Sequence, residues 1–103
     1  MKYNNKKETV DGLFFHSGKE ASHYRYLRTL ERAGEITDLE MQKTFELLPK
    51  QDGERAVKYI ADFCYKNSEG VAVVEDVKGF KTKDYILKRK MMLYFHNVKI
   101  IEV

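Results

Sequence analysis

The sequence predicts an α+β domain in which a mixed β-sheet is flanked by helices. Two amphipathic helical patterns, at residues 17–33 and 82–96, enclose a block whose apolar residues follow strand spacing. A further apolar segment, residues 98–103, follows the second helical pattern. A strand followed by a crossover helix and another strand favours a parallel pair with a right-handed connection. The predicted order is helix, two or three antiparallel strands, helix and strand.

Length and composition fit one small globular domain. At 103 residues the chain can form one core and has little length for a second. The apolar fraction of 43% argues against disorder, and 34% charged residues indicate a well-solvated surface. No apolar run approaches the roughly 20 residues of a membrane-spanning helix, and no signal-peptide core follows the basic start. We therefore expect a cytoplasmic protein without a membrane partner. Cys64 is the only cysteine, which excludes an internal disulfide and a thiolate zinc cluster.

The first elements are a tail, an extended segment and a helix. Residues 1–8 are polar and basic and are expected to form a flexible tail, whereas residues 9–103 form the domain. Residues 9–15 are predicted to be extended. Ser17-Gly18-Lys19-Glu20 has the spacing of a capping box, and Gly34 is suited to end the helix. Apolar residues between these ends recur at helical spacing: Ala21, Tyr24, Leu27 and Leu30.

The remaining elements follow from turn residues and apolar spacing. Residues 36–47 are predicted to form one or two strands, and residues 50–54 form a polar turn. Residues 55–65 and 71–78 are predicted to pair as strands across the turn at residues 67–70. The second helix, residues 82–96, ends at Asn97, and residues 98–103 form the last strand.

Charged residues lie inside two of these apolar strands. Asp62 follows an apolar stretch, and Asp76 and Lys78 belong to the next strand. Side chains alternate between the faces of a strand, so Asp76 and Lys78 point to one face and Glu75 to the other. A hairpin closed at residues 67–70 brings Asp62 beside Asp76. Two carboxylates and a lysine at one place suit a divalent cation such as Mg²⁺, which takes oxygen ligands.

Together with Glu20, the residues Asp62 and Asp76-Val77-Lys78 resemble the PD-(D/E)xK nuclease superfamily. That resemblance implies a restriction-endonuclease-like fold with an αβββαβ core. Most of residues 9–103 also resemble a small phage- and prophage-associated domain family of uncharacterised function. The second similarity is carried by residues 11–12, 17–21, 34–36, 59–63 and 75–79. Two positions depart from the nuclease pattern, because Ala61 replaces a proline and Asp76 replaces the commoner glutamate.

The nuclease resemblance implies a metal-dependent endonuclease that hydrolyses DNA in a bacterial host cell. Asp62 and Asp76 would be the metal-binding carboxylates, with Mg²⁺ or Mn²⁺ as the cofactor. Lys78 would orient or activate the attacking water, and Glu20 would be the acidic residue of the first helix and a further metal ligand. A domain this small has little room for sequence recognition, which favours structure-selective or weakly specific cutting, including that of branched DNA. Cutting both strands favours a symmetric homodimer.

A basic run follows the proposed site and consists of Lys81, Lys83, Lys88, Arg89 and Lys90. Such a run is the ordinary surface of a solvated helix. In a nuclease the same cations contact the phosphate backbone without reading base sequence. Both interpretations stay open, and the net charge of +3 is compatible with an anionic partner without demonstrating one.

The proposed catalytic and metal-binding residues also have simpler structural interpretations. Asp62, Asp76 and Lys78 also suit a structural ion-pair network, and Glu20 also suits the third helical position of a capping box. Glu75 joins the site only if its strand is bulged. The three histidines lack zinc-site spacing and are read as surface or packing residues. The alternative function is a non-catalytic nucleic-acid- or protein-binding module that retains the nuclease fold. A purely structural protein leaves the buried acids and lysine least explained.

Overall fold

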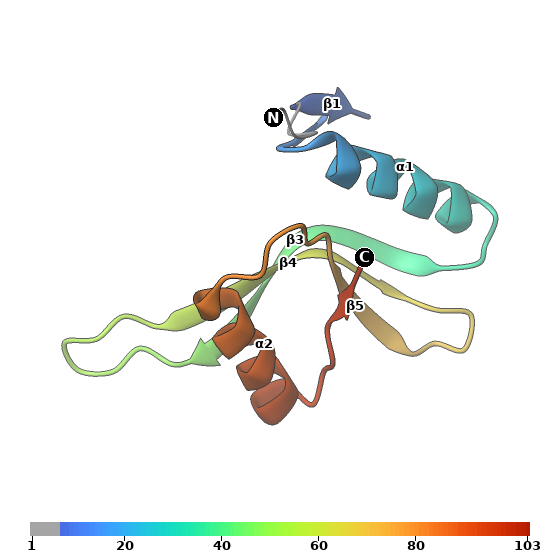
Figure 1. The fold of residues 1–103 in the computed structure, drawn as a ribbon. Helices are drawn as coiled ribbons and strands as arrows, with labels where there is room; N and C mark the ends of the chain where they lie inside the picture. The colour runs from blue at the N-terminus through green and yellow to red at the C-terminus, as the bar shows by residue number, and fades with distance from the viewer. Residues whose placement is uncertain (1–6) are drawn as a thin grey trace.

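The computed structural model describes residues 7–103, which form a four-stranded mixed sheet flanked by two helices (Figure 1). The elements are β1 (Glu8–Val10), β2 (Leu13–Phe15), α1 (Gly18–Arg32), β3 (Thr37–Leu48), β4 (Val57–Lys66), β5 (Ala72–Asp76), α2 (Lys83–His96) and β6 (Ile101–Glu102). The main sheet has the strand order β3-β4-β5-β6. β3, β4 and β5 are antiparallel neighbours, and β6 is parallel to β5. The predicted fold class and the order helix, three strands, helix, strand are confirmed.

The N-terminal segment differs from the prediction at one boundary. β1 and β2 form a separate two-stranded hairpin, which turns at Asp11 (φ 53°) and Gly12 (φ 77°). Glu8, which was expected in the tail, begins β1 and forms an ion pair with Arg25 of α1. Backbone pairing with Phe15 and this ion pair hold Glu8 against the domain. Lys7 precedes the strand, and residues 1–6 of the predicted tail lie outside the described residues.

Both helices begin and end close to the predicted residues. The hydroxyl oxygens of Ser17 and Thr82 each accept a backbone N–H three residues later, at 3.1 Å. Gly34 follows α1 with a left-handed φ of 80°, and Asn97 ends α2 with φ 55°. These are the conformations that close a helix C-terminus. Neither helix, within the described chain, has the length and apolar character needed to cross a membrane.

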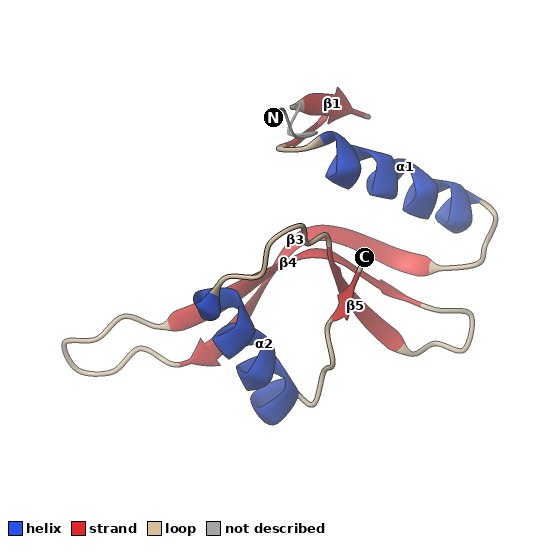
Figure 2. Ribbon diagram, viewed as in Figure 1, coloured by secondary structure: helices blue, strands red, loops and turns tan. Residues whose placement is uncertain are grey.

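The strands agree with the predicted pairing but differ in length. β3 is one continuous strand, and it joins β4 as a long hairpin that extends beyond α2 (Figure 2). The turn at residues 67–70 closes the β4–β5 hairpin, with the backbone N–H of Gly70 donating to the carbonyl of Asn67 at 2.9 Å. The last strand is shorter than predicted, because only Ile101 and Glu102 pair with β5. Ile100 is instead buried in the core between α2 and the sheet.

Two apolar cores lie on opposite faces of the sheet, one beneath each helix (Figure 2). The α1-side core contains Phe15, Ala21, Tyr24, Leu27, Ile36 and Phe63. The α2-side core contains Leu47, Tyr59, Ala61, Cys64, Val74, Tyr85, Met92 and Ile100. Burial raises the pKa of the Cys64 thiol to about 11, so this cysteine is an uncharged packing residue.

The inward-facing residues of β4 change sides at Asp62. Ala61 packs into the α2-side core, whereas Phe63, two residues further along the same strand, packs into the α1-side core. A regular strand would keep both residues on one face. Met41 of β3 pairs with Phe63, which places Gln42 opposite Asp62, and Gln42 has a left-handed φ of 55°. The strand pair is therefore irregular where it carries Asp62, and the side chain of Asp62 is left half-buried.

Candidate active site

The β4–β5 hairpin brings Asp62 and Asp76 together, as the sequence predicts. Pairing of Phe63 with Glu75 places the two aspartates at neighbouring positions of adjacent strands. The backbone N–H of Asp62 donates to Oδ1 of Asp76 at 3.0 Å. The backbone N–H of Val77 donates to Oδ2 of Asp62 at 2.9 Å. Each carboxylate is thus held by the backbone of the opposite chain segment, which fixes their relative positions.

Asp76 is the most enclosed member of the site, with 1% of its surface exposed. Its Oδ2 accepts a hydrogen bond from the hydroxyl of Tyr59 and lies 3.4 Å from Nζ of Lys78. Lys78 Nζ also lies over the ring of Tyr85, at 4.3 Å from its centroid. Burial and the charge of Asp62 raise the pKa of Asp76 to about 6, against the opposing effects of the Tyr59 hydrogen bond and Lys78. β5 ends at Asp76, two residues before the predicted strand reaches Lys78, but the Lys78 side chain still lies beside Asp76.

Glu20 reaches the same region from α1 and is linked to Asp62 by Gln42. Nε2 of Gln42 lies 3.3 Å from Oε2 of Glu20 and 3.4 Å from Oδ1 of Asp62. Burial raises the pKa of Asp62, and the charge of Glu20 acts in the same direction. Ser17 does cap the helix, through the backbone N–H of Glu20, while the Glu20 carboxylate points to the sheet. The cap and the site position are therefore compatible.

The three carboxylates form two linked pairs: Asp62 with Asp76, and Asp62 with Glu20 through the Gln42 amide. Within residues 7–103, no group of three or more His, Cys, Asp or Glu side chains has a geometry that could hold a metal ion. Asp76 directs its oxygens to Tyr59, Lys78 and the backbone of Asp62, whereas the Gln42 amide separates Glu20 from Asp62. Carboxylate oxygens are nevertheless the donors that Mg²⁺ and Mn²⁺ prefer. The side-chain N–H group of Gln42 lies between the carboxylates of Glu20 and Asp62. The negative charges of these two groups would also stabilise a cation at that position.

Glu75 points away from Asp76 and forms a separate cluster on the α1 side. Its Oε1 lies 2.6 Å from Nε2 of His23, and its Oε2 accepts a hydrogen bond from the hydroxyl of Tyr65 at 2.5 Å. Burial acts to raise the pKa of Glu75, but the hydrogen bonds from His23 and Tyr65 outweigh it and lower the pKa. The prediction that Glu75 faces away from Asp76 is confirmed. His23, which was expected only to pack or face solvent, is paired with a buried carboxylate.

Two residues of the site, Gln42 and Tyr59, were not predicted from the sequence, and neither was Tyr65 of the Glu75 cluster. A single exposed glutamine carries no sequence signal for its left-handed backbone or for its position between two acids. The tyrosines carry a weak signal, because a buried tyrosine hydroxyl needs a partner. Their spacing on a strand that also bears Asp62 was the available indication.

The basic run is partly neutralised by ion pairs. Glu102 lies 3.6 Å from Nζ of Lys81 and 2.8 Å from a guanidinium nitrogen of Arg89, and Asp84 lies 3.6 Å from Nζ of Lys88. Lys83 and Lys90 are exposed on α2. Partly exposed pairs of this kind contribute little to stability. Phosphate contact by these residues therefore stays a prediction.

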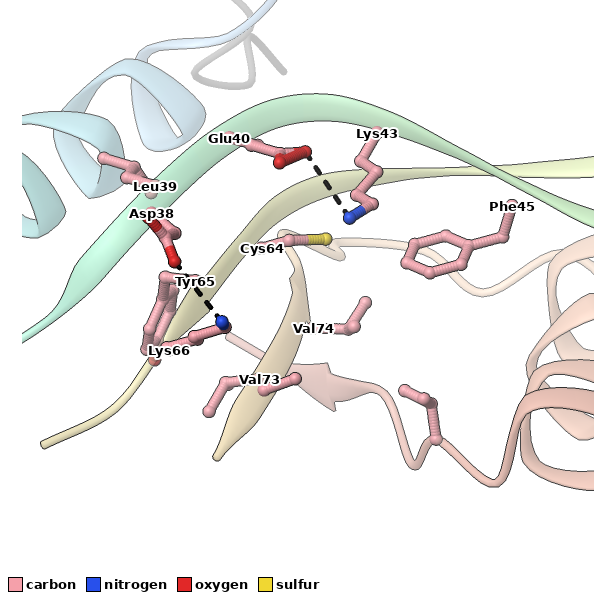
Figure 3. A pocket seen from close by; sticks show the side chains of 12 residues that line it. Asp38, Leu39, Glu40, Lys43, Phe45, Cys64, Tyr65, Lys66, Val73 and Val74 are labelled. Carbon is pink, nitrogen blue, oxygen red and sulfur yellow. Dashed lines mark ion pairs between the residues drawn. The ribbon is translucent and has the colours of Figure 1, made fainter. Parts of the chain in front are cut away.

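A cavity of about 530 Å³ lies over β3, β4 and β5 (Figure 3), and Asp62, Asp76 and Glu20 do not line it. Ion pairs at 3.5 Å join Asp38 to Lys66 and Glu40 to Lys43 at its rim. Cys64 and Val74 lie at its base. None of the four predicted catalytic residues lines this cavity, so the candidate site is a separate feature of the sheet.

Comparison with known proteins identifies a family. No curated protein and no solved structure matches the chain. A family model matches residues 1–102, which is almost the whole of the 103-residue chain. The chain therefore belongs to the family described as "Protein of unknown function (DUF1064)".

Proposed function

We propose that this protein is a Mg²⁺- or Mn²⁺-dependent endonuclease that hydrolyses phosphodiester bonds of DNA. The observation that carries the proposal is the meeting of Asp62 with the Asp76-Val77-Lys78 segment across β4 and β5. Glu20 supports it, because α1 directs this carboxylate to the same region. The order of helices and strands also agrees with that of the PD-(D/E)xK superfamily, which the sequence resembles.

The proposed residues supply distinct parts of the chemistry. Phosphodiester hydrolysis requires a nucleophilic water and stabilisation of the charge that develops on the phosphate and the leaving oxygen. Asp62, Asp76 and Glu20 would hold the divalent ion, which when bound neutralises phosphate charge. Asp76 holds the Lys78 ammonium in place at 3.4 Å. An ammonium so positioned donates hydrogen bonds to a water or a phosphate oxygen without a change of rotamer.

Substrate preference follows from the size and number of sites. The domain has little surface for base recognition, so we propose structure-selective or weakly specific cutting that includes branched DNA. Each chain offers one candidate site, so cutting both strands favours a symmetric homodimer.

The second candidate is a non-catalytic nucleic-acid- or protein-binding module with the same fold. The contacts of Asp76 favour this candidate. Its nearly inaccessible carboxylate contacts the backbone N–H of Asp62, the hydroxyl of Tyr59 and the ammonium of Lys78. Such saturation is typical of a buried structural network. This candidate predicts salt-sensitive nucleic-acid binding that survives Asp62→Asn and needs no divalent ion.

Cleavage assays test the enzyme directly. Linear, nicked and branched DNA, and matching RNA, would be incubated with Mg²⁺, Mn²⁺ or a chelator. We expect metal-dependent cutting by the wild type, and a loss of at least about 100-fold in Asp62→Asn and Lys78→Gln. Asp52→Asn is the matched control, because Asp52 is exposed in the turn between β3 and β4.

Two results would contradict the nuclease. One is the absence of cutting with either metal, and the other is equal cutting by the wild type and both site variants. Calorimetric titration with Mn²⁺ separates the two candidate functions. Saturable binding that is lost in Asp62→Asn supports the metal site, whereas nucleic-acid binding without metal binding supports the non-catalytic module.

A further inference from the structure

A second polar site lies beside the carboxylates, on the α1 side of the sheet. It is a cavity of about 270 Å³ lined by Lys19, Ser22, His23, Tyr26, Val77 and Val103. The first four residues recur at helical spacing, so α1 presents an ammonium, a hydroxyl, an imidazole and a phenol along one stripe. The two valines follow β5 and β6 and close the cavity with apolar surface.

The imidazole of His23 is held in place by contacts with residues of the sheet. Glu75, which is 7% exposed, lies 2.6 Å from Nε2 of His23 and also accepts the hydroxyl of Tyr65. The ring of Phe63 packs edge-on against the imidazole, with the ring centroids 5.3 Å apart. A buried carboxylate and an aromatic ring thus determine the orientation of His23.

The cavity is joined to the candidate active site through one residue. Val77 lines the cavity, and its backbone N–H holds Oδ2 of Asp62 at 2.9 Å. The cavity therefore adjoins the residues at which the proposed nuclease would hold the scissile phosphate. Lys19 and Ser22 are exposed, and Tyr26 is 57% exposed, so these three side chains are accessible to a nucleic-acid strand.

We propose that this cavity binds a backbone phosphodiester of an unpaired nucleic-acid strand next to the scissile bond. Lys19 and Ser22 contact the phosphate oxygens, His23 forms part of the cavity wall, and Tyr26 stacks on the adjoining base. Ammonium and hydroxyl groups are common phosphate donors, and an aromatic ring stacks on any base that is free of its neighbours. The position of the scissile bond next to this cavity rests on the proposed nuclease function, whereas the binding of an unpaired strand in the cavity does not.

Fluorescence anisotropy with a labelled single-stranded oligonucleotide bearing a 5′-hydroxyl tests this site. Chelator in the buffer prevents cleavage. We expect Lys19→Gln to weaken binding roughly fivefold and to lower the slope of log affinity against log salt by about 0.7, the value for one phosphate contact on a single strand. Ser22→Ala and Tyr26→Leu should also weaken binding, while Tyr26→Phe retains it. Lys58→Gln is the control, because it removes the same charge from an exposed position of β4.

The outcomes separate this inference from the proposed nuclease. Equal binding and equal salt slopes for Lys19→Gln and Lys58→Gln would overturn the phosphate site, even if the wild type cuts DNA. Selective weakening in Lys19→Gln without any cutting would support the site and contradict the nuclease. If only a 5′-phosphorylated oligonucleotide or inorganic phosphate competes, the ligand is a phosphate monoester and the proposal is overturned. Tighter binding to intact duplex than to single strand would likewise overturn it.

Discussion

Replacement of Asp76 by asparagine should make the protein more stable at neutral pH. Asp76 is almost completely buried, and Asp62 is the second carboxylate of the pair. Asparagine has nearly the same shape, and its carbonyl oxygen can still accept the backbone N–H of Asp62. Its amide also carries no charge at any pH of the experiment. The variant therefore removes the electrostatic cost of Asp76 and preserves most of the packing.

The magnitude follows from the pKa of Asp76, which rises from the ordinary 3.8 to about 6 in the folded protein. A shift of about two units corresponds to about 3 kcal/mol in the free energy of unfolding. Because the folded pKa is raised, the folded protein binds more protons than the unfolded chain between these two values. The contribution of Asp76 to stability is therefore complete below about pH 4 and is lost as pH rises to about 6. Part of the gain in Asp76→Asn is offset, because the amide nitrogen faces the ammonium of Lys78.

Urea denaturation at pH 4, 5, 6 and 7, in the presence of chelator, measures this effect. The free energy of unfolding of Asp76→Asn minus that of the wild type should increase by about 2 to 3 kcal/mol from pH 4 to pH 7. Asp52→Asn serves as the control, since Asp52 is exposed, and its difference from the wild type should stay nearly constant. A pH-independent difference for Asp76→Asn, or one that decreases with pH, would refute the assignment of a raised pKa to this residue.

Three further variants test other contacts by the same denaturation method. Tyr59→Phe removes the buried donor to Asp76 and should cost about 2 kcal/mol at pH 7; a cost below about 0.5 kcal/mol would show that the bond is unimportant. Glu75 has a lowered pKa, so the wild type should lose stability as pH falls below the ordinary value of 4.5, and Glu75→Gln should lose less over that range. Gln42→Gly should be about 1 kcal/mol more stable than Gln42→Ala, because only glycine adopts the left-handed φ without strain; equal stabilities would argue against that backbone conformation.

Local signals in the sequence were sufficient to predict the helices and the central hairpin. Ser17 and Thr82 accept backbone N–H groups at the two helix starts, and Asn97 has the left-handed conformation that ends α2. Alternation along β5 correctly separated Glu75 from Asp76, because residues 72–76 form a regular strand paired with β4. Each of these features depends on a few neighbouring residues, which is why the sequence alone identifies it.

The features that were not predicted depend on contacts between distant segments. Gln42 adopts a left-handed conformation opposite Asp62, although nothing in its immediate neighbours requires this. The pairing of His23 with Glu75 joins α1 to β5, two elements whose relative position follows from the packing of the whole domain. Glu8 is similarly ordered by its pairing with Phe15 of β2 and by its ion pair with Arg25. The residues next to Glu8 in the sequence do not indicate these contacts.

The two acids of β5 show why Asp76 is the better candidate for chemistry. Glu75 and Asp76 are adjacent and both nearly inaccessible, yet the pKa of Glu75 is lowered and that of Asp76 is raised. Burial alone does not account for the difference, since it acts on both residues in the same direction. Hydrogen bonds from His23 and Tyr65 stabilise the Glu75 carboxylate, whereas Asp76 also experiences the negative charge of Asp62. A structural ion pair with Lys78 would need only one acid. The fold instead keeps two repelling carboxylates beside one lysine, an arrangement that is electrostatically unfavourable for stability and is more often found at functional sites.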